Sequence, residues 1–160
     1  MYKVIWFLAT AILLICLFFF VLAFLSHSAS SNLIGIRNGS LNECPTSPNC
    51  VCSDISEKKD SPAKISPFFL KPQPHPLEWE RLSSAIVLAG GKIETRSEDY
   101  LHATFRSRFF QFVDDLELRR EGLVVHVRSA SRVGHSDLGV NRKRVEAIKE
   151  NLNAGGEEKD

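Results

Sequence analysis

Apolar residues are concentrated at the start of the chain and recur at regular intervals later on. From residue 5 to residue 25 there is no charged side chain, and only Thr10 and Cys16 relieve the apolar run. A helix of these 21 residues would measure about 31 Å at 1.5 Å per residue, which matches the hydrocarbon core of a bilayer. The pattern therefore predicts a membrane-spanning helix over residues 4–25.

The length of this run favours a permanent anchor over a cleavable signal peptide, whose apolar region is usually about 7–15 residues long. Small residues at 28–30 would suit a cleavage site, so that alternative stays open. Lys3 precedes the run, whereas residues 26–36 contain no Lys or Arg. The positive-inside bias then predicts a single pass through the inner (cytoplasmic) membrane. Residues 1–3 would be cytoplasmic, and the C-terminal domain would lie in the periplasm or outside.

The segment after the anchor has no regular apolar pattern. Residues 26–43 are small and polar with two glycines, and we expect a tether. Residues 44–76 begin with a cysteine-rich turn and continue into a proline-rich extended segment. Five prolines between positions 62 and 76 exclude a helix and a central strand in that run. Within this part, the Phe-Phe-Leu sequence at 68–70 is expected to pin an extended segment onto the domain.

Two helices are expected, one on each side of a run of strands. Pro76 suits the first turn of a helix, and Gly90-Gly91 ends the apolar pattern that follows. The second helix is expected from about residue 138 to 152, with Asp137 as its N-cap. The apolar stripes at helical spacing are Trp79, Leu82, Ile86 and Ala89 in the first helix, and Val145, Ile148 and Leu152 in the second.

Four runs between these helices have the alternating pattern of half-buried strands. They cover residues 92–97, 100–107, 112–119 and 123–130, and short polar links separate them. The expected fold is α+β: a helix, a four-stranded antiparallel meander and a second helix, with both helices on one sheet face. Residues 77–153 would form this core, and residues 154–160 would form a disordered tail.

Charge and cysteine content narrow the function classes. The formal net charge is +1, so no long-range field draws the protein to nucleic acid, and any basic recognition must be local. We predict a disulfide between Cys44 and Cys50, because the residues between them favour a turn and an exported domain keeps its disulfides. Cys50 and Cys52 are too close to bridge comfortably. No metal site is predicted, because a fourth Cys or His at a usual spacing is lacking, and no cofactor is predicted.

Three motifs resemble those of a known family. They read CPTSPNCVCS at 44–53, FVDDLELR at 112–119 and RSASRVGHSDLGVNRKRVEAI at 128–148. Together they resemble the family catalogued as domain of unknown function 1499, over about residues 41–152. Many of its members are exported or membrane-linked bacterial proteins, but the family has no established activity, so the resemblance implies no reaction. Cys52 stands where the family usually has Ser, which makes Cys52 either the free thiol or an alternative partner of Cys44.

The polar sides of the last two strands bring ionisable residues together. If residues 121–122 form the turn, Glu117 lies opposite His126 and Asp115 lies opposite Arg128. Such a patch has the composition of a general acid–base or metal site. Ordinary ion pairs on a solvated sheet face have the same composition, and we favour that interpretation because an exposed sheet face must be polar.

The stretch 128–144 joins the last strand to the last helix and holds the other candidates. Asp114 should point toward the covered face and needs a partner there, so we favour a structural staple over a catalytic acid. The helix dipole disfavours cations near the start of the last helix, so a negative group, either internal or a bound ligand, should offset them. The predicted anion-binding residues are Arg128, Arg132, Arg142 and Arg144, and the internal partners are Asp114, Asp115 and Asp137.

Two functions are compatible with these patterns. The first is a membrane-anchored, non-enzymatic binding or structural module, which takes an anionic ligand or a protein partner at the junction 128–144. The second is a hydrolase-like enzyme that uses Asp114 or Asp115 with His126 or His135. An enzyme requires an acid and a base that converge on a deep pocket. A useful observation for choosing between these functions is whether the junction arginines converge on open space or on Asp114 and Asp115.

Overall fold

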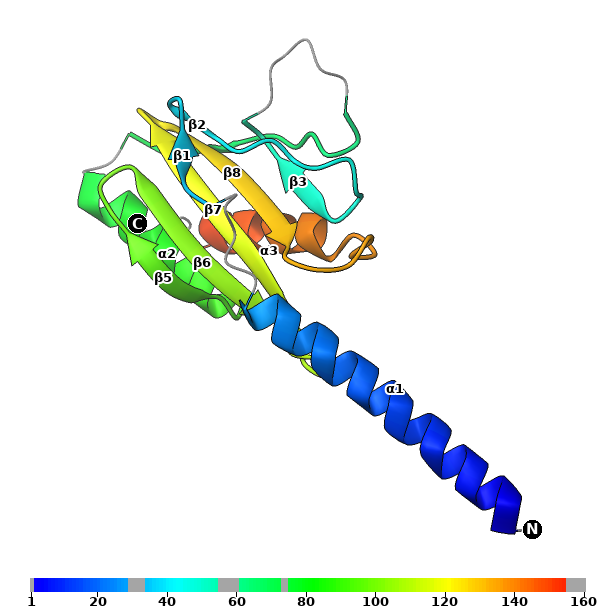
Figure 1. Cartoon of the computed structure of the whole chain (residues 1–160). Helices are drawn as coiled ribbons and strands as arrows, with labels where there is room; N and C mark the ends of the chain where they lie inside the picture. Colours follow the sequence, from blue (N-terminus) through cyan, green and yellow to red (C-terminus); the bar gives the residue numbers. More distant parts are fainter. Residues whose placement is uncertain (1, 29–33, 55–60, 73–74, 155–160) are drawn as a thin grey trace.

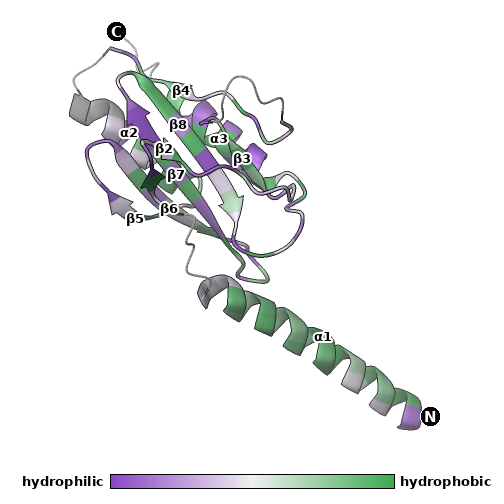
Figure 2. Ribbon diagram, turned by 45° about the horizontal axis from the view of Figure 1, so that its top comes forward, coloured by the Kyte–Doolittle hydropathy of each residue, from purple (hydrophilic) through white to green (hydrophobic). Residues whose placement is uncertain are grey.

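A long apolar helix projects from a folded domain (Figure 1). The computed structural model describes residues 2–28, 34–54, 61–72 and 75–154, so parts of the predicted cleavage stretch, extended segment and tail lie outside the described residues. The helix, α1 (Tyr2–Ser28), is long and apolar enough to cross a membrane over Tyr2–Ser26. Figure 2 shows apolar residues along almost all of it. A signal sequence meets the same criterion of length and composition.

The domain contains a six-stranded sheet in place of the predicted four-stranded meander. The strand order is β3-β8-β7-β6-β5, β4 also pairs with β8, and these strands pair in antiparallel fashion. The two strands that the sequence does not predict have three and two residues, too few for an alternating pattern to identify them. The bounds are β3 Cys50–Cys52, β4 Phe68–Phe69, β5 Lys92–Arg96, β6 Tyr100–Arg106, β7 Val113–Glu121 and β8 Val124–Ser131.

Two helices, α2 (His75–Leu88) and α3 (Val140–Ala154), share one apolar core with one face of the sheet. α2 ends as expected, because Gly90 adopts a φ of 90° and the N–H of Gly91 donates to the carbonyl of Ile86 at 2.9 Å. α3 begins two residues later than predicted, because Leu138 and Gly139 have positive φ. The sheet contributes Leu101, Ala103, Phe105, Leu116, Leu118, Val125 and Val127 to this core.

The proline-rich segment is fixed to the domain through β4. Phe68 and Leu70 are buried in the core, whereas Phe69 is 68% exposed and faces away from it. Two of the three residues at 68–70 therefore hold the segment in place. The third remains a large apolar side chain on the surface, at the end of β8 that starts with Val124.

The second face of the sheet is buried, which corrects the prediction of a solvated face. A hairpin of β1 (Ile36–Arg37) and β2 (Ser40–Leu41) lies over it and contacts β7 and β8 (Figure 1). Part of the expected tether at 26–43 is therefore structured. The sequence signal for it is Asn38-Gly39, a typical hairpin dipeptide, in which both residues adopt positive φ.

The register of β7 and β8 differs from the prediction. Gly122, with a φ of 62°, starts the two-residue turn, so Glu121 stays in the strand and pairs with Val124. Every pairing therefore moves by two residues. Glu117 lies opposite Arg128, while His126 lies opposite Arg119. A shift by two keeps each side chain on its predicted face but gives it a different partner.

The close approach of α2 to β6 at Gly91 gives the first testable prediction. An added Cβ at this position would lie 2.6 Å from Ile86 Cγ2 and 2.7 Å from Phe105 Cζ, both in the core. Gly91→Ala should therefore lower the free energy of unfolding by about 1–3 kcal/mol through overpacking. Urea unfolding of the protein in detergent measures this. Ser84→Ala, at an exposed position of α2, is the control and should have little effect, and equal stabilities would contradict the packing argument.

Candidate functional site

The buried face of the sheet carries a network of ionisable side chains. His102, Asp115, Glu117 and Arg128 are each at most 8% exposed. The Asp115 carboxylate accepts hydrogen bonds from Nε and Nη2 of Arg132, both at 2.8 Å, and lies 2.8 Å from Nε2 of His102. Buried charges are tolerated when they are paired and hydrogen-bonded. Asp115 meets that condition through His102 of β6 and Arg132, which directly follows β8.

Glu117 is fully buried and has three donors. They are Nη1 of Arg128 at 3.0 Å, the Tyr100 hydroxyl at 2.9 Å and the backbone N–H of Gly35 at 2.6 Å. The last of these bonds fixes the segment that leads into the covering hairpin. The N–H of Leu41, at the other end of the hairpin, donates to Asp54 at 2.8 Å. The carboxylates of Glu117 and Asp54 therefore bind backbone N–H groups at the two ends of the hairpin.

Burial and hydrogen bonding shift the pKa values of Asp115, Tyr100 and the nearby Cys52 away from their usual ranges. Burial alone would raise the pKa of Asp115, but the hydrogen bonds from Arg132 and His102 outweigh burial and lower that pKa below its usual value. Burial and the neighbouring Glu117 raise the pKa of Tyr100, so its hydroxyl stays a donor. Burial also raises the pKa of the free Cys52 thiol to about 11, which keeps it unreactive.

No pair of Asp114 or Asp115 with His126 or His135, as the hydrolase hypothesis requires, forms in the described part of the chain. The histidine that contacts Asp115 is His102. His126 instead lies 3.8 Å from Asp54 and 3.8 Å from Glu121, because the true register places it opposite Arg119. His135 is exposed in the loop before α3.

Asp114 lies on the helix-covered side, as its phase predicts. Its carboxylate accepts a hydrogen bond from Nη2 of Arg144 at 2.6 Å, and the guanidinium of Arg144 lies 4.4 Å from the centre of the Phe105 ring. The Arg144 side chain is 10% exposed. Asp114 therefore joins β7 to α3, which is the structural role that we favour for it.

Asn141, which the sequence reasoning missed, links the junction to the cysteine turn. It is fully buried, and its amide donates to the carbonyl of Asn49 at 3.0 Å and to Ser131 at 3.1 Å. Its carbonyl oxygen accepts from Ser129 at 2.6 Å and from Arg144. The side chain of Asn49 in turn donates to the carbonyl of Gly134 at 2.6 Å. Both asparagines stand inside the motifs noted above, and those motifs are the signal that could have identified them.

The Asp137 side chain caps backbone N–H groups at the start of α3, although the helix itself begins at Val140 rather than next to Asp137. The carboxylate accepts the backbone N–H groups of Gly139 at 2.9 Å and Asn141 at 2.8 Å. Burial alone would raise the pKa of Asp137, but these bonds lower it below its usual value. Asp137 thus interacts with backbone donors, whereas Asp114 and Asp115 pair with arginines.

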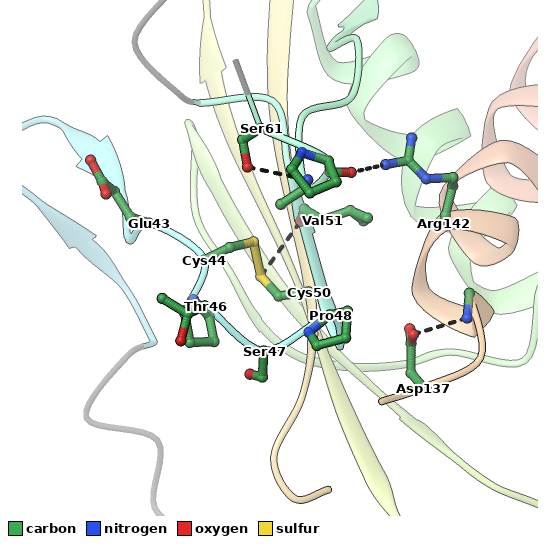
Figure 3. Close-up of a pocket in the computed structure, with 14 residues that line it drawn as sticks. Glu43, Cys44, Thr46, Ser47, Pro48, Cys50, Val51, Ser61, Asp137 and Arg142 are labelled. Atoms are coloured by element: carbon green, nitrogen blue, oxygen red, sulfur yellow. Dashed lines mark hydrogen bonds between the residues drawn. A yellow bond between two sulfur atoms is a disulfide. The ribbon is translucent and has the colours of Figure 1, made fainter. Parts of the chain in front are cut away.

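A pocket of about 380 Å³ lies between the cysteine turn and the start of α3. The predicted disulfide between Cys44 and Cys50 is present and forms one side, while Asp137 and Arg142 lie on the other (Figure 3). We call this cavity the disulfide pocket; it is lined by residues 43–48, 50, 51, 61–63, 137, 139 and 142. In the described residues, no group of three or more His, Cys, Asp or Glu side chains could hold a metal ion.

The four arginines of the junction have different surroundings. Arg128, Arg132 and Arg144 each contact a carboxylate, on Glu117, Asp115 and Asp114 respectively. Arg142 instead donates from Nη2 to the carbonyl of Pro62 at 2.6 Å, with longer contacts to the carbonyl of Lys64, and it lines the disulfide pocket. The junction arginines therefore do not converge on one open site.

The fold and these contacts define a small α+β domain with a buried ionic network and a long apolar N-terminal helix. The chain belongs to the family described as "Protein of unknown function (DUF1499)", whose model matches residues 40–152 of its 160 residues. No curated protein matches the chain. Since the family description includes no activity, the function has to be argued from the site.

The depressed pKa of Asp115 predicts acid sensitivity. The folded-state pKa lies below the unfolded-state value of about 3.9, so the unfolded chain binds more protons in this window and stability rises with pH. The contribution is fully present above the unfolded-state pKa and is lost as the pH falls through the folded-state pKa. Asp115→Asn should lower the free energy of unfolding at pH 7 by about 3–5 kcal/mol, because it leaves Arg132 unpaired, and should flatten the acid slope.

Urea unfolding in detergent between pH 3 and pH 7 tests this prediction. Asp99→Asn is the matched control, because Asp99 is an exposed aspartate at the turn before β6. The control should keep both the stability and the acid slope. If Asp115→Asn behaved like Asp99→Asn, the network would not be a source of stability.

Proposed function

We propose that the protein is a membrane-anchored, non-enzymatic domain that binds a small anionic group in the disulfide pocket. The helix α1 would be the anchor, with its N-terminus in the cytoplasm and the domain in the periplasm or outside. Its apolar length supports the anchor. Lys3 at the N-terminal end of α1, with no Lys or Arg in residues 26–36, supports this orientation. The disulfide is consistent with an exported domain.

The position of Arg142 is the observation that carries this proposal. Of the four arginines predicted to bind an anion, it alone has no carboxylate partner in the described residues. Its guanidinium is oriented by backbone carbonyls at the wall of the pocket. An anion could therefore add to the contacts of Arg142 without breaking an ion pair, and a bidentate anion matches the geometry of a guanidinium.

The other three arginines support the fold in this proposal. A ligand that recruited Arg132 would have to leave Asp115 buried with one partner fewer, and breaking a buried pair in this way is strongly destabilising. The same argument applies to Arg128 with Glu117. The predicted anion site at the junction is thus narrowed to Arg142 and the hydroxyl-bearing residues of the pocket lining, Thr46, Ser47 and Ser61.

Binding fits the pocket better than catalysis does. The lining includes hydroxyl, carboxylate and disulfide groups but no histidine, and its cysteines are oxidised. Asp137, the carboxylate nearest the start of α3, is held ionised by backbone N–H donors. A general base needs a pKa near the working pH and a proton to accept from a neighbouring nucleophile. The lining residues do not provide that combination.

Phosphate binding at Arg142 gives a direct test. A ligand that binds only the folded state raises its stability by mass action, by about 2.7 kcal/mol at one hundred times the dissociation constant. Phosphate should therefore raise the melting temperature of the full chain in uncharged detergent, at matched ionic strength. Arg142→Ala should fold and lose this shift.

Lys143→Ala is the matched control, because Lys143 is the exposed neighbour of Arg142 and carries the same charge. It should keep the full phosphate shift. Equal shifts in the two variants would show that phosphate acts through general charge, and the pocket would then have no role in binding.

The anchor is tested separately by intact-mass analysis of the membrane fraction. An uncleaved chain should have the mass of all 160 residues, apart from changes at the initiator methionine. A mature form that starts near residue 31 would show that α1 is a signal sequence. That result would leave the pocket proposal standing but would remove the membrane anchor.

A further inference from the structure

The loop that joins β6 to β7 exposes two adjacent phenylalanines. Phe109 is 84% exposed and Phe110 is 45% exposed, and a third aromatic residue, Phe112, follows them. Exposed apolar clusters of this kind on a folded domain indicate contact with a membrane or another protein. The loop lies at the end of the sheet where α1 leaves the domain (Figure 1).

Two contacts place this loop beside α1. The ring of Phe110 stacks on Phe19 of α1, with centroids 4.3 Å apart and planes 21° apart, and the ring of Phe112 follows at 5.6 Å. At the end of the helix, the N–H of Val113 donates to the fully buried hydroxyl of Ser26 at 2.8 Å. The loop therefore runs alongside the last two turns of the candidate span.

The depth of Phe19 then determines where the loop lies. Tyr2–Ser26 has 25 residues and would measure about 37 Å, and Phe19 lies about 10 Å from its outer end. If the span is centred on a hydrocarbon core of about 30 Å, Phe19 lies roughly 7 Å inside the outer boundary. Phe110 is stacked against it and so reaches the same leaflet.

We propose that residues 107–112 form a second membrane-contact site, which inserts Phe109 and Phe110 into the outer leaflet beside α1. The occupant of this surface is lipid. This inference rests on the proposed role of α1 as an anchor, because only a spanning α1 carries Phe110 to the bilayer.

The internal bonding of the loop suits this environment. Ser107 closes it: its N–H donates to the carbonyl of Phe112 at 2.9 Å, and its hydroxyl accepts the N–H of Phe112 at 3.0 Å. Gln111 adds an N–H bond to the carbonyl of Ser107 at 3.2 Å and side-chain bonds to Ser107 and Arg108. Polar backbone groups that are already paired reduce the cost of leaving water.

Arg108 complements the two aromatic rings. Its guanidinium carbon lies 5.9 Å from the centre of the Phe109 ring, and the side chain is exposed. A long arginine side chain can extend its charged end to the lipid phosphates while its stem and the aromatic ring stay in the apolar region. The loop thus has the amphipathic arrangement of an interfacial anchor.

The test uses a nitroxide spin label on the full chain, reconstituted in vesicles of phosphatidylcholine with phosphatidylglycerol. The label is attached at Phe109→Cys in a Cys16→Ser background, since Cys52 is buried and Cys44 and Cys50 are bonded. The matched control is Phe69→Cys, which is also an exposed phenylalanine but lies at the far end of the sheet. Collisions with oxygen report lipid, and collisions with a water-soluble nickel complex report solvent.

We expect the label at position 109 to collide with oxygen and to lose its nickel collisions severalfold on reconstitution, while the label at position 69 keeps them. High nickel access at position 109 in a chain that floats with the vesicles and resists carbonate extraction would overturn the lipid contact and leave the anchor intact. Low access to both reagents would indicate a protein partner and would also overturn it. A chain that carbonate extracts from the vesicles would reject the anchor, and the inference with it.

Discussion

Two carboxylates buried in the middle of β7 impose the constraint on which the rest of the domain depends. Asp115 and Glu117 have lost nearly all contact with water, and an ionised carboxylate in that position needs several donors. The donors come from β6, β8, the junction and the segment before β1. Elements that are distant in the sequence are thereby held on one sheet face by ionic and hydrogen-bonded contacts. The opposite face is held mainly by apolar packing, together with the Asp114–Arg144 pair.

This constraint also gives most of the arginines in the basic motif a structural role. Three of its arginines are matched to carboxylates one by one. Such pairing offsets the local charge of these three arginines and limits the candidate ligand contact to Arg142, at the edge of the disulfide pocket. Asn141 and Asn49 bring that pocket wall and the cysteine turn together. The pocket therefore depends on the same junction that completes the ionic network.

The junction is also linked to α1, the proposed membrane anchor, through Val113. Val113 donates its N–H to Ser26 of α1, and its carbonyl accepts the N–H of Arg132, the residue that pairs with Asp115. One short backbone segment thus contacts the helix, the network and the start of the junction. The aromatic loop 107–112 and the first part of the junction lie at the same end of the sheet, because Val113, next to the loop, bonds to Arg132.

The sequence by itself determined the features that depend on local periodicity. The apolar length of α1, the apolar stripes of α2 and α3, and the four long strands follow from residue spacing. The Cys44–Cys50 bridge also follows from local sequence, because a turn-forming loop separates the two thiols. Asp114 could be assigned to the covered face because side chains on a strand alternate between its two faces.

Only the tertiary structure decided the features that depend on long-range contacts. The strands β3 and β4 are too short to have a pattern and exist because β8 offers them an edge. The turn between β7 and β8 lies one residue later than predicted, at Gly122. This difference changed the cross-strand partner of every ionisable group on β7. The sequence predicted that the sheet face with the ionisable residues is solvated, because these residues alternate with apolar ones as they do on an exposed sheet. That face is buried because those charges neutralise one another, and alternation along a single strand contains no information about pairing between strands.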